Sequence, residues 1–244
     1  MKRIIYIDYL RNLANITRCC IHASVPYMVT LAPMWPVNDK GSWFFDFAIF
    51  EGHLFVMELF FVISGFMFAM ELKKSSVPKI LKNRFKRIVI PFILGLIVLV
   101  PIVLSLFSLG NHVGFTFLDF DVIKTSYISG WVLGFENFFP TAHLWFLYYL
   151  IIFYILTLSL KSVIYKIKFN SIFKLTIVGV IISSICMFFM KRWIVENPLT
   201  LVPEIPSLTH FYVFFLSGFI IFNNTVLIDE IKRNLKYLLS AGLF

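Results

Sequence analysis

The stretch Asp8–His22, inside the first apolar segment, reads DYLRNLANITRCCIH. On a helix, where each residue turns about 100°, five polar or ionisable side chains of this stretch share an arc of about 80°. These five side chains are Asp8, Arg11, Asn15, Arg18 and His22. The rest of the segment is mostly apolar, as in a membrane-crossing helix. A charge at the middle of a bilayer costs at least about 2.5–3.5 kcal/mol, so this polar stripe must face protein, water or a ligand.

The composition is that of a multi-pass membrane protein. Of the 244 residues, 59% are hydrophobic, 18% are aromatic and only 14% are charged. A typical soluble domain has about 25% charged residues, and so many phenylalanines would make its surface adhesive. The formal net charge of +9 does not point to nucleic acid, because the basic residues gather at the ends of apolar segments, where membrane topology places them.

The apolar runs predict an all-α bundle with six complete membrane spans and the start of a seventh. The six spans are expected at Ile4–Leu31, Phe47–Leu72, Ile88–Leu109, His143–Leu160, Leu175–Met190 and Leu208–Phe222. The last apolar run, Tyr237–Phe244, is too short to cross a bilayer, which takes about 20 residues. We therefore expect residues 1–244 to form a single membrane domain that is incomplete at its C-terminus.

The distribution of lysine and arginine predicts that the N-terminus is cytoplasmic. With that orientation, sixteen of these residues fall in inner segments and four in outer loops. The basic stretch Lys73–Arg87, read as a connector between two spans, holds seven of them. Such a bias is a strong positive-inside signal, and it places the chain in the cell membrane as a multi-pass protein.

Two residues of the polar stripe suggest chemistry. Arg11 and His22 are eleven residues apart on one face, about 16.5 Å along a helix axis. A neutral imidazole, with an unperturbed pKa of about 6.5, is suited to act as a general base. Arg11, with Arg84 and Arg87 from the basic stretch, presents guanidinium groups that suit phosphates. The alternative is that Asp8 and Arg11 only pair with each other and that His22 only packs; five polar groups in one arc favour function.

Other polar residues leave two interpretations open. Glu58 either orients an imidazole or pairs with Arg18, or it is a protonated, hydrogen-bonded acid. His143, next to Trp145, is either an active-site residue or an interfacial one. Arg84 and Arg87 are either phosphate ligands or ordinary inner-side charges. The residues read as belonging to loops or interfaces are His112, His210, Glu136 and Glu204. The chain has no glycine-rich phosphate loop, zinc-binding spacing or Ser-His-Asp order.

Four runs together resemble the motifs of the membrane acyltransferase family 3. Tyr6–Arg11 with His22 is similar to its first-span Arg-x10-His motif, and Glu58–Phe66 (ELFFVISGF) to its second-span signature. Arg84–Pro91 (RFKRIVIP) is similar to its basic stretch that ends in proline. His143–Leu147 (HLWFL) looks most like the subgroup of the glucans biosynthesis protein C type. Family members usually have more spans than this chain supplies, and Asn15 and Arg18 are unusually polar for the first span.

The resemblance implies an integral membrane O-acyltransferase. It would move an acetyl or succinyl group from cytoplasmic acyl-CoA, a co-substrate, to a hydroxyl of an extracytoplasmic carbohydrate such as a glucan. No permanently bound cofactor and no metal are expected. The expected catalytic residues are His22, Arg11 and Glu58. The expected substrate-binding residues are Asp8, Asn15, Arg18, Ser64, Arg84, Arg87, His143 and Trp145. The alternatives are a transporter or flippase of glycans or lipids, with the stripe lining a conduit, and a noncatalytic membrane subunit.

Overall fold

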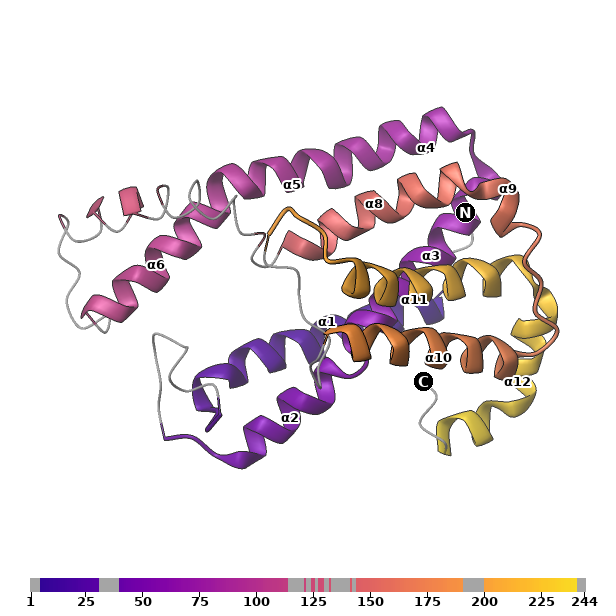
Figure 1. The fold of residues 1–244 in the computed structure, drawn as a ribbon, viewed down its shortest axis with the longest axis horizontal. Helices are drawn as coiled ribbons and strands as arrows, with labels where there is room; N and C mark the ends of the chain where they lie inside the picture. The colour runs from indigo at the N-terminus through magenta and orange to yellow at the C-terminus, as the bar shows by residue number, and fades with distance from the viewer. Residues whose placement is uncertain are drawn as a thin grey trace. The chain divides into compact units, whose positions relative to one another are not determined.

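The protein is helical throughout the part described by the structure, a computed structural model (Figure 1). That part comprises residues 5–30, 40–113, 144–190 and 200–240, with isolated positions between residues 121 and 141. By length and composition, four helical stretches in these residues can cross a membrane. They are Trp43–Lys74, Val77–Phe107, Ile172–Met190 and Ile205–Asn223. The all-α class is therefore confirmed, with four candidate spans where the sequence predicted six complete ones.

Two of the six predicted spans fall outside this set for different reasons. Helix α1 (Ile5–Ser24) carries charged side chains in its apolar sequence, which lowers its hydropathy. Helix α8 (Trp145–Ser159) has 15 residues, fewer than the about 20 that a bilayer requires.

The first predicted span also ends early, because Pro26 lacks an N–H and the chain continues as the 3-10 helix η1 (Val25–Tyr27). The second predicted span is two helices, α2 (Trp43–His53) and α3 (Val56–Lys74), separated by a turn at Leu54 and Phe55.

Most of the predicted connector Lys73–Arg87 is helical, with one short interruption. Lysine and arginine are good helix formers, and the interruption is confined to Ser75 and Ser76. Two π-helical segments follow, and each ends two residues before a proline, Pro91 or Pro101. A proline ring clashes with the carbonyl four residues earlier, and the wider π turn relieves that clash. The elements in order are α4 (Val77–Arg84), η3 (Phe85–Val89), α5 (Ile90–Leu94), η4 (Gly95–Leu99) and α6 (Val100–Val113).

The described chain divides into two compact units, of which the first contains residues 5–56, 84–149 and 200–203. In it, α1 packs along α2 (Figure 1). Asp46 of α2 accepts hydrogen bonds from the backbone N–H groups of Val29, at 2.8 Å, and Thr30, at 3.0 Å. Gly52 of α2 lies against the side chain of Ile21. These contacts fix which side of α1 is covered.

The second unit contains residues 57–83, 150–190 and 204–240 and has an aromatic core. Phe61, Phe153 and Phe215, from α3, α8 and α11, are fully buried, with ring centroids of neighbouring pairs 5.1–5.6 Å apart. Edge-to-face and tilted contacts of this kind stabilise aromatic pairs beyond the area they bury. The remaining elements of the unit are α9 (Lys161–Ile164), α10 (Ile172–Met190), α11 (Ile205–Asn223) and α12 (Thr225–Ser240).

Helices α3 and α11 approach so closely that their backbones touch. A Cβ atom on Gly65 would overlap the carbonyl oxygen of Phe215, and one on Gly218 would overlap the carbonyl oxygen of Val62. The lack of a side chain at these two glycines permits this close helix packing. Glu58 meets His210 near the start of both helices and Lys73 meets Phe222 near their ends, so α3 and α11 are parallel. Helix α10 lies beside α11 and runs in the opposite direction, with Gly179 facing Val213 (Figure 1).

Helix α12 folds back against the ends of α10 and α11 (Figure 1). Leu227 is fully buried with Ile172, Leu175 and Ile220. The carboxylate of Glu230 accepts hydrogen bonds from the N–H of Ile172, at 2.6 Å, and the hydroxyl of Ser171, at 2.7 Å, at the start of α10. The predicted start of a seventh span begins at Tyr237, in the last turn of α12. Its residues 241–244 lie outside the described part.

Candidate functional site

In the first unit, the polar stripe of α1 lies beside the surface that packs on α2. Ala14 and Ile21 are buried, at 1% and 7% exposure, and form the covered side. Within the stripe, Asp8 and Arg18 are half-buried, and Arg11, Asn15 and His22 are exposed. Since α1 is one uninterrupted helix, Arg11 and His22 stay on the same side of it, about three turns apart.

The basic candidates of the same unit lie on the long helix that starts at Val77. Arg84 ends α4 and is half-buried, whereas Arg87 lies in the π segment η3 and is exposed. Trp145 begins α8 and is buried, at 4% exposure, with its ring edge-on to Tyr149 at 5.9 Å. The predicted site residue His143 lies outside the described residues.

The second unit contains a buried acid–imidazole pair. Glu58, in the first turn of α3, and His210, in the second turn of α11, are 8% and 4% exposed. The Oε1 atom of Glu58 lies 3.2 Å from Nε2 of His210. The second carboxylate oxygen of Glu58 and Nδ1 of His210 are buried without a hydrogen-bond partner. Ser64, another predicted site residue, is half-buried further along α3.

Sequence reasoning assigned His210 to a loop or interface, and that was wrong. The signal that would have found it is the spacing to glycine. Glu58 lies seven residues before Gly65, and His210 eight residues before Gly218. Seven or eight residues are about two helical turns, so on two parallel helices that cross at these glycines both polar side chains reach the same level.

The surroundings of the pair favour the hydrogen bond between its two members. The ring of His210 contacts the rings of Phe211 and Phe214, with centroids 5.0 and 5.1 Å apart. In such apolar surroundings an unpaired charge is costly, so carboxylate and imidazole are stable together as one hydrogen-bonded unit. The pair ties α3 to α11. In the residues that the structure describes, no group of three or more His, Cys, Asp or Glu side chains is arranged to bind a metal ion.

Comparison with known protein families identifies the class. The model of the acyltransferase 3 family, described as an acyltransferase domain, matches residues 4–244. The chain therefore belongs to the acyltransferase 3 family. Together with the four apolar helical stretches, this makes it a multi-pass membrane protein and an acyltransferase, of a family whose domain implies O-acyl transfer from an acyl donor. The chain matches no curated protein and no solved structure.

Proposed function

We propose that this acyltransferase moves an acetyl or succinyl group from cytoplasmic acyl-CoA to a hydroxyl of an extracytoplasmic carbohydrate, such as a glucan. His22 takes the proton of the sugar hydroxyl while the oxygen attacks the thioester carbonyl. The new carbon–oxygen bond forms, the carbon–sulfur bond breaks, and the departing thiolate takes the proton from the imidazolium. No metal and no permanently bound cofactor are needed for this step.

The arrangement of α1 is the observation that supports the proposal. The helix uses its small and apolar residues, Ala14 and Ile21, for packing, and it leaves Arg11 and His22 exposed on one side. A helix whose polar groups served only packing would turn them towards its neighbour. Arg11 and His22 are separated by about 16.5 Å along the helix axis. This separation allows Arg11 to hold a phosphate of acyl-CoA while the extended pantetheine arm of acyl-CoA reaches His22.

The other candidate residues take supporting roles in this proposal. Arg84 and Arg87 bind donor phosphates, because guanidinium groups match phosphate geometry. Asp8, Asn15 and Arg18 line the path between Arg11 and His22.

The assignment of Trp145, His143 and Ser64 to substrate binding rests on their sequence motifs alone. Glu58 acts through its hydrogen bond to His210, as a positioning residue.

The test is acyl transfer by the purified full chain in liposomes, with labelled acetyl-CoA or succinyl-CoA and oligosaccharide acceptors. We expect His22→Ala to lower kcat by about 10²–10⁴-fold. The matched control is His53→Ala, because the His53 ring bonds within its own helix, with Nδ1 lying 2.8 Å from the carbonyl oxygen of Ile49. Wild-type activity in a correctly inserted His22→Ala protein would refute the catalytic assignment. Glycan flux without consumption of acyl-CoA would favour a transporter, and activity only with added chains would favour a subunit.

A further inference from the structure

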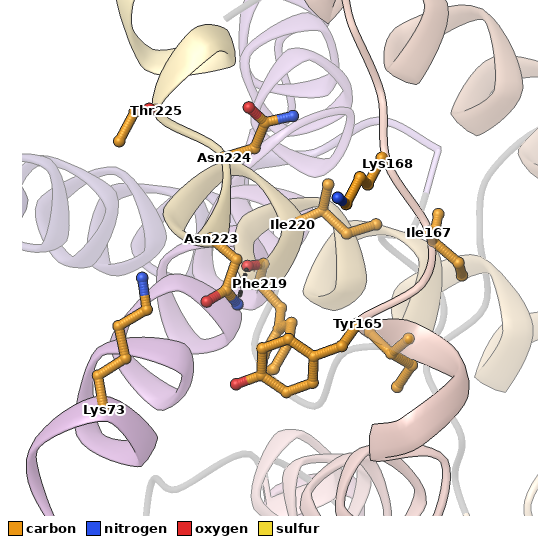
Figure 2. A pocket seen from close by; sticks show the side chains of 10 residues that line it. Lys73, Tyr165, Ile167, Lys168, Phe219, Ile220, Asn223, Asn224 and Thr225 are labelled. Atoms are coloured by element: carbon orange, nitrogen blue, oxygen red, sulfur yellow. Dashed lines mark hydrogen bonds between the residues drawn. The ribbon is translucent and has the colours of Figure 1, made fainter.

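The second unit contains a cavity of about 460 Å³ where α3 and α11 end (Figure 2). Its walls come from the end of α3, the segment after α9, and the junction of α11 with α12. The cavity has an apolar floor, since Ile164, Phe219 and Ile220 are buried at 4%, 1% and 7% exposure. It lies within one unit and includes none of the residues assigned to acyl transfer.

The rim of the cavity is basic. Lys73 from α3 and Lys168 from the segment after α9 both border it, on opposite sides of Asn223 (Figure 2). The Lys73 ammonium lies 4.8 Å from the centroid of the Phe222 ring, a cation–π contact that holds it at the rim. All side chains that line the cavity are cationic, polar or apolar, and none is acidic. Two ammonium groups without a lining carboxylate favour an anion.

Hydrogen-bonding groups add selectivity. Asn224 is already used, because its amide donates to the carbonyl of Phe169 and its oxygen accepts from the N–H of Val226 at 3.2 Å. Asn223 donates to the carbonyl of Phe219 at 3.0 Å, but its side-chain oxygen is buried without a partner. An unpartnered acceptor beside two cations suits a ligand that carries a hydroxyl next to its negative charge.

Tyr165 supplies a donor at the same rim. Its ring lies edge-on to Phe219, with centroids 5.7 Å apart. Partial burial raises the pKa of the Tyr165 phenol, so this group stays protonated well above neutral pH and can donate to a phosphate oxygen. The rim therefore offers two cations and a neutral donor above an apolar floor.

We propose that this cavity binds the phosphodiester of an anionic phospholipid with a hydroxylated headgroup, its glycerol backbone resting on the apolar floor. The positive-inside prediction assigns Lys73 and Lys168 to the cytoplasmic face, where basic pockets between membrane helices meet anionic headgroups. A soluble phosphate ester shares the phosphate chemistry but has no use for the apolar floor, so the lipid is the favoured source.

The test is native mass spectrometry of the purified full chain with phosphatidylglycerol, phosphatidylcholine or free coenzyme A as the probe. We expect wild-type protein to retain phosphatidylglycerol in preference to phosphatidylcholine, and Lys73→Gln/Lys168→Gln to lose about tenfold or more of that retention. The matched control is Lys79→Gln/Lys82→Gln, which removes the same charge from exposed positions outside the cavity lining. Lys168 is exposed, so Lys168→Glu provides a second variant that spares the buried residues.

The outcomes separate the possible sources of the phosphate. Retention of phosphatidylglycerol that coenzyme A does not displace supports the lipid site. Retention of coenzyme A alone, lost in the same variants, keeps the phosphate site and overturns the lipid as its source. Equal retention of both lipids, or equal loss in the control variant, overturns the proposal. The readout is binding, so it is independent of whether acyl transfer occurs.

Discussion

Glu58 and His210 lie 3.2 Å apart, Oε1 to Nε2, although 152 residues separate them in the sequence. Both side chains are buried, on parallel helices that cross at Gly65 and Gly218. The glycine contact sets the distance between the helices and the polar pair sets their register. Glu58, the acid in the second-span signature, therefore has a partner on another helix, and the sequence around Glu58 does not identify that partner.

We expect single removal of either member of this pair to destabilise the protein by about 1–3 kcal/mol, because the other member is left buried and unpaired. Glu58→Ala and His210→Ala should each lower the midpoint of thermal unfolding in detergent. The double variant should lose less stability than the two single variants added together, since neither partner is then stranded. Additive losses would show that the two side chains do not interact.

The control for the pair is Glu51→Ala, because Glu51 is exposed on α2. We expect it to change the free energy of unfolding only within the range of ordinary surface substitutions, about ±0.5 kcal/mol.

Glu58→Gln keeps a hydrogen-bonding side chain but removes the charge. If Glu58 also serves acyl transfer, Glu58→Gln should lower kcat while it retains most of the stability.

The two crossing glycines predict a sharp difference between similar substitutions. Gly65→Ala and Gly218→Ala should each cost about 1–3 kcal/mol or more, because the added Cβ meets backbone that cannot move aside alone. Gly179→Ala is the matched control, since its Cβ would lie 3.7 Å from Val213, an ordinary contact. That change should be neutral or stabilising, because alanine favours helices over glycine by about 1 kcal/mol. Equal thermal unfolding of all three variants would contradict the crossing.

The carboxylate of Glu230 should control the attachment of α12. Glu230→Ala removes the acceptor for the N–H of Ile172 and the hydroxyl of Ser171, so the start of α10 loses its partner. We expect faster hydrogen exchange in α12 and in the first turn of α10, with α3 unchanged. Asp229→Ala is the control, because Asp229 pairs with Lys232 of the same helix and both side chains are exposed. Unchanged exchange in Glu230→Ala would show that the apolar contacts of Leu227 suffice.

A residue that only binds the donor should affect KM for acyl-CoA and leave kcat nearly unchanged. If Arg87 holds a donor phosphate, Arg87→Gln should raise KM for acyl-CoA by about 10- to 100-fold, the range expected for a charge-assisted hydrogen bond, with little change in kcat. Lys86→Gln is the control, because Lys86 is the adjacent exposed base and carries the same charge. An equal rise in KM for both variants would show that Arg87 contributes only its positive charge and makes no specific bond to the phosphate.

Local pattern was sufficient for some elements and not for others. The predicted spans Leu175–Met190 and Leu208–Phe222 match α10 and α11 closely, because long apolar runs have few alternative conformations in a membrane. The predicted connector Lys73–Arg87 is mostly helical, since lysine and arginine are good helix formers, and it is interrupted at Ser75 and Ser76. His210 was missed because a single histidine near the end of a span carries no information about what faces it.

By itself the sequence determined the all-α membrane class, the polar side of the first helix and the likeness to an acyltransferase family, since hydropathy, helical periodicity and short motifs are local properties of a chain. Tertiary structure alone decided that Glu58 meets His210, that Gly65 meets the carbonyl of Phe215, and that Lys73 and Lys168 border one cavity. These pairings depend on how helices far apart in the sequence pack. Packing is set by the complementary shapes of two helix surfaces, and no single stretch of sequence contains both surfaces.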